Sequence, residues 1–302
     1  MANPFPEVAP ELQRPEFETM VHMLAHAANE HPERTAIISG ENEITYADYF
    51  ACAAGLATAL IEMGVKGERV VVLKSNSIVT SVAAHAVWAA SGQLVLFNPL
   101  FTENELGPLI ADAAPKAVIC DLAHKEMLAP LVETNNISHF YTFDDSAVSI
   151  DQWCGNRTLK LPEPMPNSGD VAMLAFTGGT TGLPKGAIHT QEKLVIGARL
   201  VEALWSTKIA GDIWLNVAPQ SHIWGWFMTL LAPLYGCNTV VIVPQFRPDV
   251  VINELARTKA TIFAGGPSVI YNALLSVPAL KEADLSNLRL CLGGGSPFAA
   301  AT

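Results

Sequence analysis

The feature that most constrains the fold is the close alternation of helix-like and strand-like apolar blocks along the chain. Residues 20–28 and 47–63 carry apolar side chains at helical spacing, whereas the short apolar runs 70–73 and 117–120 are typical of buried strands. A further helix is expected over residues 79–90. Strands that alternate with helices at short spacing predict βαβ units and a mainly parallel sheet. We therefore expect an α/β fold made of two stacked βαβ lobes.

A segment with three prolines, residues 158–169, interrupts this alternation. We interpret the segment as a linker, which predicts a first α/β lobe over residues 1–165 and a second lobe over residues 166–302. The chain ends shortly after the glycine cluster 293–295, and no helix or strand pattern follows that cluster. The second lobe is therefore expected to be incomplete at its C-terminal end.

Composition and charge exclude several classes of function. Half of the 302 residues are hydrophobic and 16% are charged, which is typical of a globular chain rather than a disordered one. The formal net charge of −11, with no run of basic residues, argues against nucleic-acid binding. The five cysteines form no C-x-x-C pair and so indicate no zinc site. Residues 1–18 have neither the basic nor the apolar part of a signal peptide, and a cytoplasmic location is expected.

Two long stretches without charged residues, 75–102 and 213–246, raise the alternative of membrane insertion. A spanning helix needs about 20 consecutive apolar residues. The first stretch is interrupted at Gly92 and Pro99, and the second is interrupted at Pro219 and Pro233. We therefore expect both stretches to form buried helices and strands of the α/β core, with no membrane span.

The most informative segment lies between the strand-like runs 171–176 and 187–189. Residues 177–186 combine four glycines, three threonines and one lysine. Glycine lets backbone N–H groups form a concave nest, the threonine hydroxyls add donors, and the lysine adds a positive charge, which together suit a polyphosphate. The spacing matches neither G-x-x-x-x-G-K-[ST] nor G-x-G-x-x-G. An ordinary hairpin turn is the alternative, but turns seldom need this combination of residues.

This loop resembles the signature of the adenylate-forming superfamily, which includes acyl-CoA synthetases, luciferase-type enzymes and the adenylation domains of peptide synthetases. The loop departs from the usual family pattern at Gly178, which stands where serine is common. Four further segments resemble family motifs, and they follow in the family's order. These segments are residues 44–46, residues 89–106, the Pro-x-x-His segment 219–225, and the glycine-rich segment 288–297. Together the motifs cover nearly the whole chain.

The resemblance implies a role for each matched position. The loop would hold the phosphates of ATP, His222 and Lys185 would be catalytic, and Thr177 would contact Mg²⁺. Without the resemblance, a single histidine among apolar residues is more often a core residue, and a glycine cluster is as often a plain turn. The implied nucleotide-binding residues are Thr177, Gly178, Gly179, Thr180, Thr181, Gly182, Lys185, Gly294, Gly295 and Ser296. The implied substrate-pocket residues are His222, Trp224, Gly225, Gly265 and Gly266.

In the family reaction, a carboxylate attacks the α-phosphate of ATP, pyrophosphate leaves, and the acyl group of the acyl-adenylate passes to a thiol, usually that of coenzyme A. Residues 213–246 contain no Asp or Glu that could pair with the ammonium group of an amino acid. An unpaired ammonium there would be costly, so a plain fatty or aryl carboxylic acid is favoured. The resemblance thus implies the N-terminal part of a carboxylic acid:CoA ligase.

Two alternatives to this ligase remain open. The chain could be a nucleotide-binding fragment without catalysis, or an adenylation domain that hands its acyl group to a carrier protein. The family motifs that complete the metal, ribose and catalytic-lysine sites would lie beyond Thr302, so the isolated chain is expected to lack turnover. A dinucleotide oxidoreductase is disfavoured, because no strand is followed by G-x-G-x-x-G and a helix.

Overall fold

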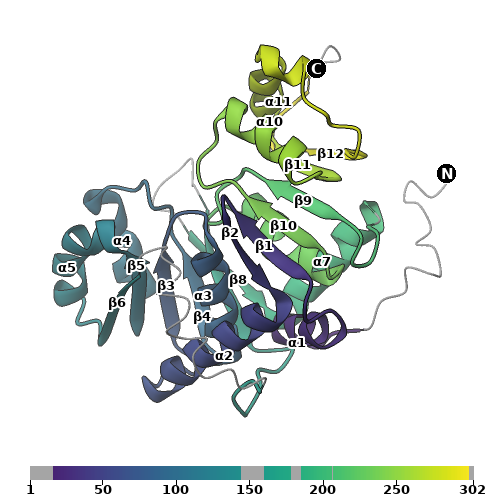
Figure 1. The fold of residues 1–302 in the computed structure, drawn as a ribbon. Coiled ribbons are helices and arrows are strands. Elements are labelled where there is room, and N and C mark those ends of the chain that lie inside the picture. The colour runs from purple at the N-terminus through teal and green to yellow at the C-terminus, as the bar shows by residue number, and fades with distance from the viewer. Residues whose placement is uncertain (1–15, 144–159, 178–184, 206, 299–302) are drawn as a thin grey trace, which may run out of the picture.

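The computed structural model describes residues 16–143, 160–177, 185–205 and 207–298, and its strands form two six-stranded sheets (Figure 1). Sheet A has the order β12-β11-β9-β10-β1-β2. Sheet B has the order β6-β5-β3-β4-β7-β8. The only antiparallel pairs within these sheets, among the described residues, are β1 with β2 and β7 with β8. The expected α/β class with two stacked, mainly parallel sheets is confirmed.

The strands are short, as the apolar runs predicted. Those of sheet A are β1 (Thr35–Ser39), β2 (Asn42–Thr45), β9 (Ile213–Asn216), β10 (Thr239–Ile242), β11 (Ile262–Gly266) and β12 (Leu290–Gly293). Those of sheet B are β3 (Arg69–Leu73), β4 (Gln93–Leu96), β5 (Ala117–Asp121), β6 (His139–Phe143), β7 (Val171–Thr177) and β8 (Lys185–Thr190).

Each sheet takes strands from both halves of the chain. β1 enters sheet A by pairing in parallel with β10, and β7 enters sheet B by pairing in parallel with β4. The proline-bearing segment expected to link two lobes connects β6 to β7, which belong to the same sheet. The division expected between residues 165 and 166 therefore does not separate one sheet from the other.

Helices cover the sheets in separate layers (Figure 1). They are α1 (Met20–Glu30), α2 (Tyr46–Glu62), α3 (Ile78–Ala89), α4 (Glu103–Ala113), α5 (Lys125–Thr134), α7 (Gln191–Leu204), α8 (Ile223–Trp226), α9 (Ala232–Tyr235), α10 (Pro248–Arg257) and α11 (Ser268–Leu275). Short 3₁₀ segments are η2 (Leu122–His124) and η4 (Pro278–Lys281), whereas η3 (Phe227–Leu231) is a π-helical turn that joins α8 to α9.

The alternation of side chains along the strands shows which hydrophobic core lies against each face of a sheet. In sheet B, Val70 and Val72 belong to a large central core that also contains residues of sheet A, whereas Val71 belongs to a smaller core against α4 and α5. In sheet A, Val240 faces the central core and Val241 faces a third core against α10 and α11. Successive strand residues point to opposite faces, so both sheets are covered on both faces.

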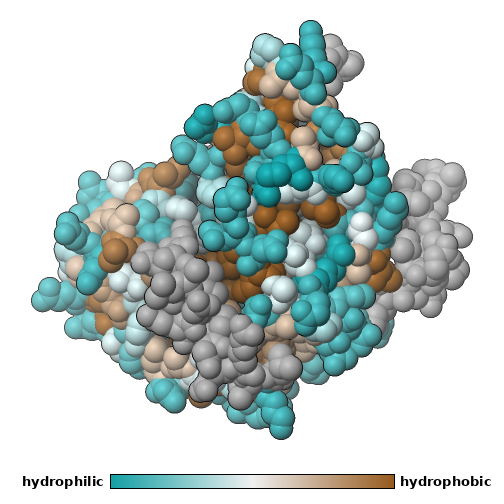
Figure 2. Space-filling view, viewed as in Figure 1, coloured by the Kyte–Doolittle hydropathy of each residue, from teal (hydrophilic) through white to brown (hydrophobic). Residues whose placement is uncertain are grey.

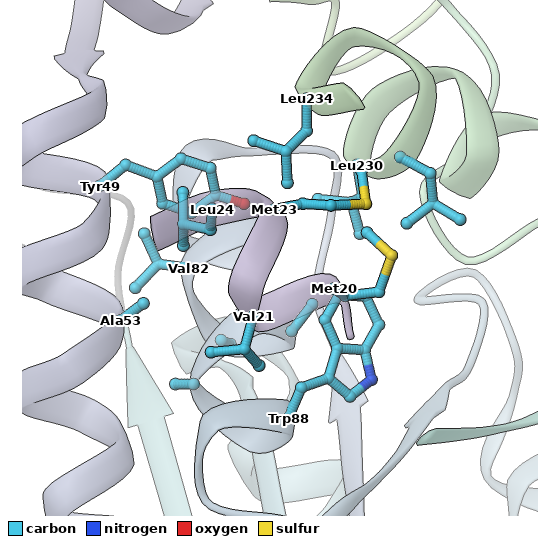
Figure 3. Packing of buried hydrophobic residues seen from close by; sticks show 14 of the residues in the cluster. Met20, Val21, Met23, Leu24, Tyr49, Ala53, Val82, Trp88, Leu230 and Leu234 are labelled. Atoms are coloured by element: carbon cyan, nitrogen blue, oxygen red, sulfur yellow. The ribbon is translucent and has the colours of Figure 1, made fainter. Parts of the chain in front are cut away.

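The central core is built from helices that come from distant parts of the chain. Figure 3 shows Met20 of α1 near Trp88 of α3, Met23 near Leu230, which follows α8, and Leu24 near Tyr49 of α2. Met20, Leu24 and Trp88 have no exposed surface. Burial of large apolar side chains of this kind stabilises the fold by about 1.5–3 kcal/mol each. This core fixes α1, α3 and the segment 223–235 relative to one another.

Local sequence signals explain where the helices begin and end. Thr19, Thr45 and Ser77 each accept a hydrogen bond from a first-turn amide of the following helix. Thr102 and Glu105 form the expected capping box at the start of α4. Gly64, just after α2, has a φ of +73°, which fits the left-handed termination expected there.

The two stretches without charged residues lie inside the fold, as predicted. The first stretch contains α3, all of whose residues are buried, and β4. The second contains β9, the segment 223–235 and β10. In the part of the chain that the structure describes, no helix combines the length and apolar character needed to cross a membrane.

Candidate functional site

A cavity of about 1180 Å³ lies where parallel strands of both sheets end. Sheet B contributes residues 75–76 after β3 and residues 98–100 after β4. Sheet A contributes residues 217–219 after β9 and residues 244–246 after β10, together with the ends of β11 and β12. Open α/β sheets bind ligands at the carboxyl ends of their strands. The topology therefore directs loops of both sheets to one candidate ligand site.

The glycine–threonine loop begins and ends on a β-hairpin. β7 and β8 pair antiparallel down to their last register pair, Thr177 with Lys185, and Lys185 is exposed. β7 runs parallel to β4, so the loop starts at the same edge of sheet B as the cavity-lining segment after β4. The predicted ligands Gly178, Gly179, Thr180, Thr181 and Gly182, and the side chain of Thr177, lie outside the described residues.

His222 lies at the cavity and caps α8. The backbone N–H of Trp224 donates to Nδ1 of His222 at 3.2 Å, and the N–H of Trp226 donates to the His222 carbonyl at 2.8 Å. Because Nδ1 accepts a hydrogen bond, the neutral ring carries its proton on Nε2. The exposed ring therefore offers an N–H donor at the mouth of the cavity, which is the kind of group that a carboxylate or phosphate oxygen can bind.

Glycine is required at position 225 because the backbone of the loop after β9 approaches it closely. A Cβ at this position would lie 2.1 Å from the carbonyl oxygen of Pro219 and 2.7 Å from that of Ala218. Gly225 is buried and is absent from the cavity lining. It acts behind the predicted pocket, since it lets α8 pack on the loop after β9 and so positions His222 and Trp224.

The indole of Trp224 lies against two of the predicted glycines. A Cβ on Gly294 would lie 3.0 Å from Cζ3 of Trp224, and one on Gly266 would lie 3.3 Å from its Nε1. Gly266 also has a φ of +80°, a conformation that favours glycine. The Nε1 atom of Trp224 is buried and has no hydrogen-bond partner among the described residues. An indole N–H donor without an acceptor thus lies beside the glycine-rich strand ends.

We call the three glycines that line the cavity, Gly265, Gly294 and Gly295, the glycine wall. Gly265, Gly295 and the predicted Ser296 differ in their surroundings. Gly295 lines the cavity and has a φ of +81°, and a Cβ there would have no atom within 4 Å, so a flat ligand has room against its backbone. Gly265 also lines the cavity, and a Cβ there would meet the rings of Phe263 and Tyr271. Ser296 is not part of the lining: its hydroxyl accepts a hydrogen bond from the Ser268 amide at 2.9 Å.

The structure therefore brings His222, Trp224, Gly265, Gly294 and Gly295 to one cavity. Gly225 and Gly266 lie behind its wall, and Ser296 ties the end of the glycine cluster to the start of α11. Lys185 lies at the end of the hairpin from which the predicted phosphate loop extends.

Two residues at the site were missed by the sequence analysis. Asn76, after β3, donates to the Ala218 carbonyl at 3.1 Å and accepts from the Gln220 amide at 2.7 Å. The buried Gln220 side chain accepts from the Ser77 amide at 2.8 Å and donates to Ser81 at 2.9 Å. These bonds join the loop of sheet B to the loop of sheet A at the cavity. The only sequence signal for Asn76 was that it is a polar residue inside an uncharged stretch, whereas Gln220 lies within the Pro-x-x-His segment 219–225.

Apolar side chains form the other wall of the cavity. Trp224, Phe227 and Met228 share one face of the segment 223–235, because residues three and four positions apart lie on the same side of a helix. The neighbouring Trp226 points to the central core and has no exposed surface. α7 faces them with Leu200, Val201 and Leu204, and Trp205 follows directly after the helix. Among the described residues that line the cavity, none is Asp, Glu, Lys or Arg.

Hydrophobic side chains also reach the outer surface. On the face shown in Figure 2, most of the surface is hydrophilic, and the hydrophobic residues gather in patches near its middle. Leu100, which lines the cavity, is 86% exposed, and Leu200 of α7 is 60% exposed. The cavity is therefore open to solvent along an apolar rim.

This fold and site define an α/β ligand-binding protein in which a glycine-rich wall, a histidine donor and an uncharged apolar cavity meet at the carboxyl ends of two sheets. Comparison with known families agrees with that class. The chain belongs to the family described as AMP-binding enzyme, which matches residues 24–302.

Two relatives illustrate the family at the level of sequence. The chain is 28% identical over 314 residues to a long-chain-fatty-acid–CoA ligase of Bacillus subtilis (strain 168), covering 92% of this chain and 55% of the relative. It is 30% identical over 271 residues to a feruloyl-CoA synthase of an Amycolatopsis species, covering 89% of this chain and 52% of the relative. The chain thus spans about half the length of these two relatives.

Solved structures give the same fold. The N-terminal domain of FACL13 from Mycobacterium tuberculosis, solved with an inhibitor, superposes with a TM-score of 0.84 at 23% identity and covers 94% of this chain and 72% of that one. ATP-bound MatB from Rhodopseudomonas palustris superposes with a TM-score of 0.82 at 26% identity, covering 93% of this chain and 56% of that one. The expected membership of the adenylate-forming superfamily is confirmed.

Proposed function

We propose that this chain is the N-terminal part of an ATP-dependent carboxylic acid:CoA ligase that activates a fatty or aryl acid. The observation that carries the proposal is the uncharged cavity at the strand ends, with the glycine wall on one side and apolar helix faces on the other. The names of the relatives, a long-chain-fatty-acid–CoA ligase and a feruloyl-CoA synthase, support both acid classes.

ATP would bind with its adenine against the glycine wall. The open space beside Gly295 fits a flat base, and glycine permits contact with the backbone there. The phosphates would extend to the loop between Thr177 and Lys185, where backbone amides and the lysine ammonium suit a polyphosphate. Mg²⁺ bound between the phosphates, with Thr177 near it, would neutralise charge that the amides and Lys185 leave uncompensated.

The carboxylic acid would lie in the apolar part of the cavity. Its tail would contact Val201, Phe227 and Met228, and its carboxylate would lie near the Nε2–H of His222. No carboxylate of the described lining could pair with an α-ammonium group, so an amino acid would bury an unpaired charge there. These contacts support a plain acid rather than an amino acid.

The proposed reaction brings two anions together, the carboxylate of the acid and ATP. A carboxylate oxygen attacks the α-phosphorus of ATP, the bond to pyrophosphate breaks, and an acyl-adenylate results; the thiol of coenzyme A then displaces AMP to give the thioester. Positioning and charge neutralisation dominate the barrier of such a phosphoryl-centre displacement. The part of this chain is to hold the acid beside His222 and to place the positive charge of Lys185 at the phosphates.

The isolated 302-residue chain is proposed to bind these ligands in the cytoplasm without completing turnover. The resemblance to the family implies that a Thr-Glu motif, a ribose-binding Asp and a catalytic Lys contribute from outside these residues. The relatives, which are about twice as long as the segments they share with this chain, support that view.

The test is ATP–pyrophosphate exchange, measured with a panel of fatty, aryl and amino acids. The protein used is the longest product of the gene that contains this chain, in parallel with the 302 residues alone. We expect exchange that depends on a fatty or aryl acid in the longer protein and none in the shorter. Lys185→Ala should abolish the exchange, whereas Lys193→Ala, an exposed lysine on α7, should not. Exchange with amino acids only, or with no acid at all, would contradict the proposal.

A further inference from the structure

The apolar cavity ends where Phe227 meets α7. Along α7 the cavity is lined by Leu200, Val201, Leu204 and Trp205, all in the last two turns of the helix and just after it. Gly197, one turn earlier, is not part of the lining. The ring of Phe227 lines the cavity and reaches this earlier turn, so it closes the cavity at that level.

The position of the Phe227 ring depends on the absence of a side chain at Gly197. A Cβ at Gly197 would lie 2.4 Å from Cε1 and 2.6 Å from Cζ of Phe227. Carbon atoms in contact prefer a separation of about 3.5–4.0 Å, so the ring tip would have to retreat by about 1 Å.

The buried ring of Trp226 limits where the Phe227 ring can move. Trp226 packs edge-on against the Phe227 ring, with centroids 5.2 Å apart and planes at 88°, and Trp226 is itself fully buried. Phe227 follows Trp226 in the helical segment, and Phe227 lines the cavity whereas Gly197 does not. We therefore expect a side chain at position 197 to move the ring toward the cavity.

We propose that Gly197 and Phe227 together set the depth of the acyl pocket and so the length of acid that the protein accepts. The proposal rests on the proposed function for the identity of the ligand as a carboxylic acid. Gly197→Ala shortens the pocket by moving the ring inward. Phe227→Leu removes the ring tip and lengthens the pocket toward Gly197.

The double variant Gly197→Ala/Phe227→Leu gives the sharpest expectation. Leucine lacks the ring atoms that the new alanine methyl would meet, so the methyl fills space that the ring tip leaves. The length preference should return toward that of the wild type, a reciprocal rescue that a merely structural defect would not show. Gly107→Ala is the matched control: Gly107 is also half-buried inside a helix, α4, but a Cβ there meets only Leu131 Cδ2 at 3.6 Å.

The experiment measures binding of saturated fatty acids of increasing length to the 302-residue chain by isothermal titration calorimetry. An apolar pocket discriminates one methylene by about tenfold or more. We expect the longest tightly bound acid to become shorter in Gly197→Ala and longer in Phe227→Leu, with relative affinities shifted by about tenfold, and to be unchanged in Gly107→Ala. Circular dichroism of each variant checks that it folds. If Phe227→Leu does not fold, Phe227→Met takes its place, because methionine also lacks the aromatic ring.

The outcomes separate this inference from the proposed function. If the wild type binds acids with a length limit that neither single variant moves, or if the double variant shows no return, the depth assignment is overturned while the proposed function stands. If the wild type binds no carboxylic acid of any length, the proposed function itself fails.

Discussion

Replacement of Asp212 by asparagine tests the interactions that hold the amino-terminal end of sheet A. The Asp212 side chain is fully buried just before β9. Its Oδ1 accepts from Nε of Arg289 at 3.1 Å and from the Thr261 hydroxyl at 2.7 Å, and its Oδ2 accepts from Nη2 of Arg289 and from the Lys208 amide at 2.6 Å. Arg289 and Thr261 precede β12 and β11, so one carboxylate ties together the starts of neighbouring strands.

The burial of the Asp212–Arg289 pair determines how much unfolding free energy Asp212→Asn should lose. In Asp212→Asn the side-chain NH₂ must face two donors, and Arg289 loses its counter-charge. Removing one partner of a buried ion pair costs about 3–5 kcal/mol. Because Arg289 is 33% exposed and water can solvate it, we expect the lower end, about 3 kcal/mol.

The pH dependence has a definite sign. Burial raises the pKa of Asp212, but the bonds from Arg289, the Lys208 amide and Thr261 outweigh burial and hold the pKa below its ordinary value. A carboxyl group whose pKa is lowered by folding stabilises the protein above its unfolded pKa, and this stabilisation is lost as the pH falls through the folded pKa. The difference between wild type and Asp212→Asn should therefore be largest near neutral pH and shrink on acidification.

The assay is urea unfolding of wild type, Asp212→Asn, Arg289→Met and the double variant, followed by circular dichroism. We expect the double variant to be more stable than the sum of the two single losses predicts, because the pair is coupled. Asp249→Asn is the control, since Asp249 and its partner Arg247 are both exposed, and a much smaller loss is expected there. Additive losses, or an equal loss in Asp249→Asn, would refute the reasoning.

Three further predictions concern buried or tightly packed positions. Burial lowers the pKa of His85 from 6.5 to about 4, so the unfolded chain binds more protons than the folded chain between these pH values. The wild type should therefore lose about 2 kcal/mol of unfolding free energy from pH 7 to pH 5. An unchanged pH profile in His85→Leu would count against this. Gly225→Ala should destabilise the fold by about 1–3 kcal/mol and weaken ligand binding in calorimetry, because its Cβ meets backbone at 2.1 Å; wild-type stability would contradict the packing. Tyr46→Phe removes the 2.6 Å hydrogen bond to the Asn238 carbonyl and should cost about 1–2 kcal/mol in urea unfolding; an unchanged stability would contradict this.

Local signals were sufficient to predict most helices and strands. The spacing of apolar residues over 47–63 and the run 70–73 correspond to α2 (Tyr46–Glu62) and β3 (Arg69–Leu73), since helix period and strand length leave little ambiguity there. The capping pair Thr102 and Glu105 also placed the start of α4. These features depend only on residues close in sequence.

Long-range pairing could not be predicted in the same way. The apolar pattern of β1 shows that the strand is buried, but nothing local indicates that Ile37 pairs with Val240, far along the chain. Arg289 illustrates the same limit: in sequence it belongs to the segment that leads to the glycine wall, yet it lies before β12 and pairs with Asp212. Strand β12 lies between Arg289 and Gly294 of this segment. Residues that are close together in one motif therefore lie at opposite ends of the strands of sheet A.

The candidate site residues were predicted through the resemblance to family motifs, because a lone histidine or a glycine cluster by itself would not indicate a site. His222, Trp224, Gly265, Gly294 and Gly295 do line one cavity. The roles of Gly225 and Asn76 could not be foreseen, since one is set by a contact with the Pro219 carbonyl and the other by bonds between two sheets. Such roles arise from tertiary packing, which a single sequence does not display.

The most direct test of the central claim is a crystal structure of this chain with a non-hydrolysable fatty acyl-adenylate analogue. We predict that the adenine lies against Gly294 and Gly295, the carbonyl near Nε2 of His222, and the tail between α7 and the helical face of Trp224 and Phe227. An analogue bound elsewhere, or bound with its acyl tail outside this cavity, would contradict the account.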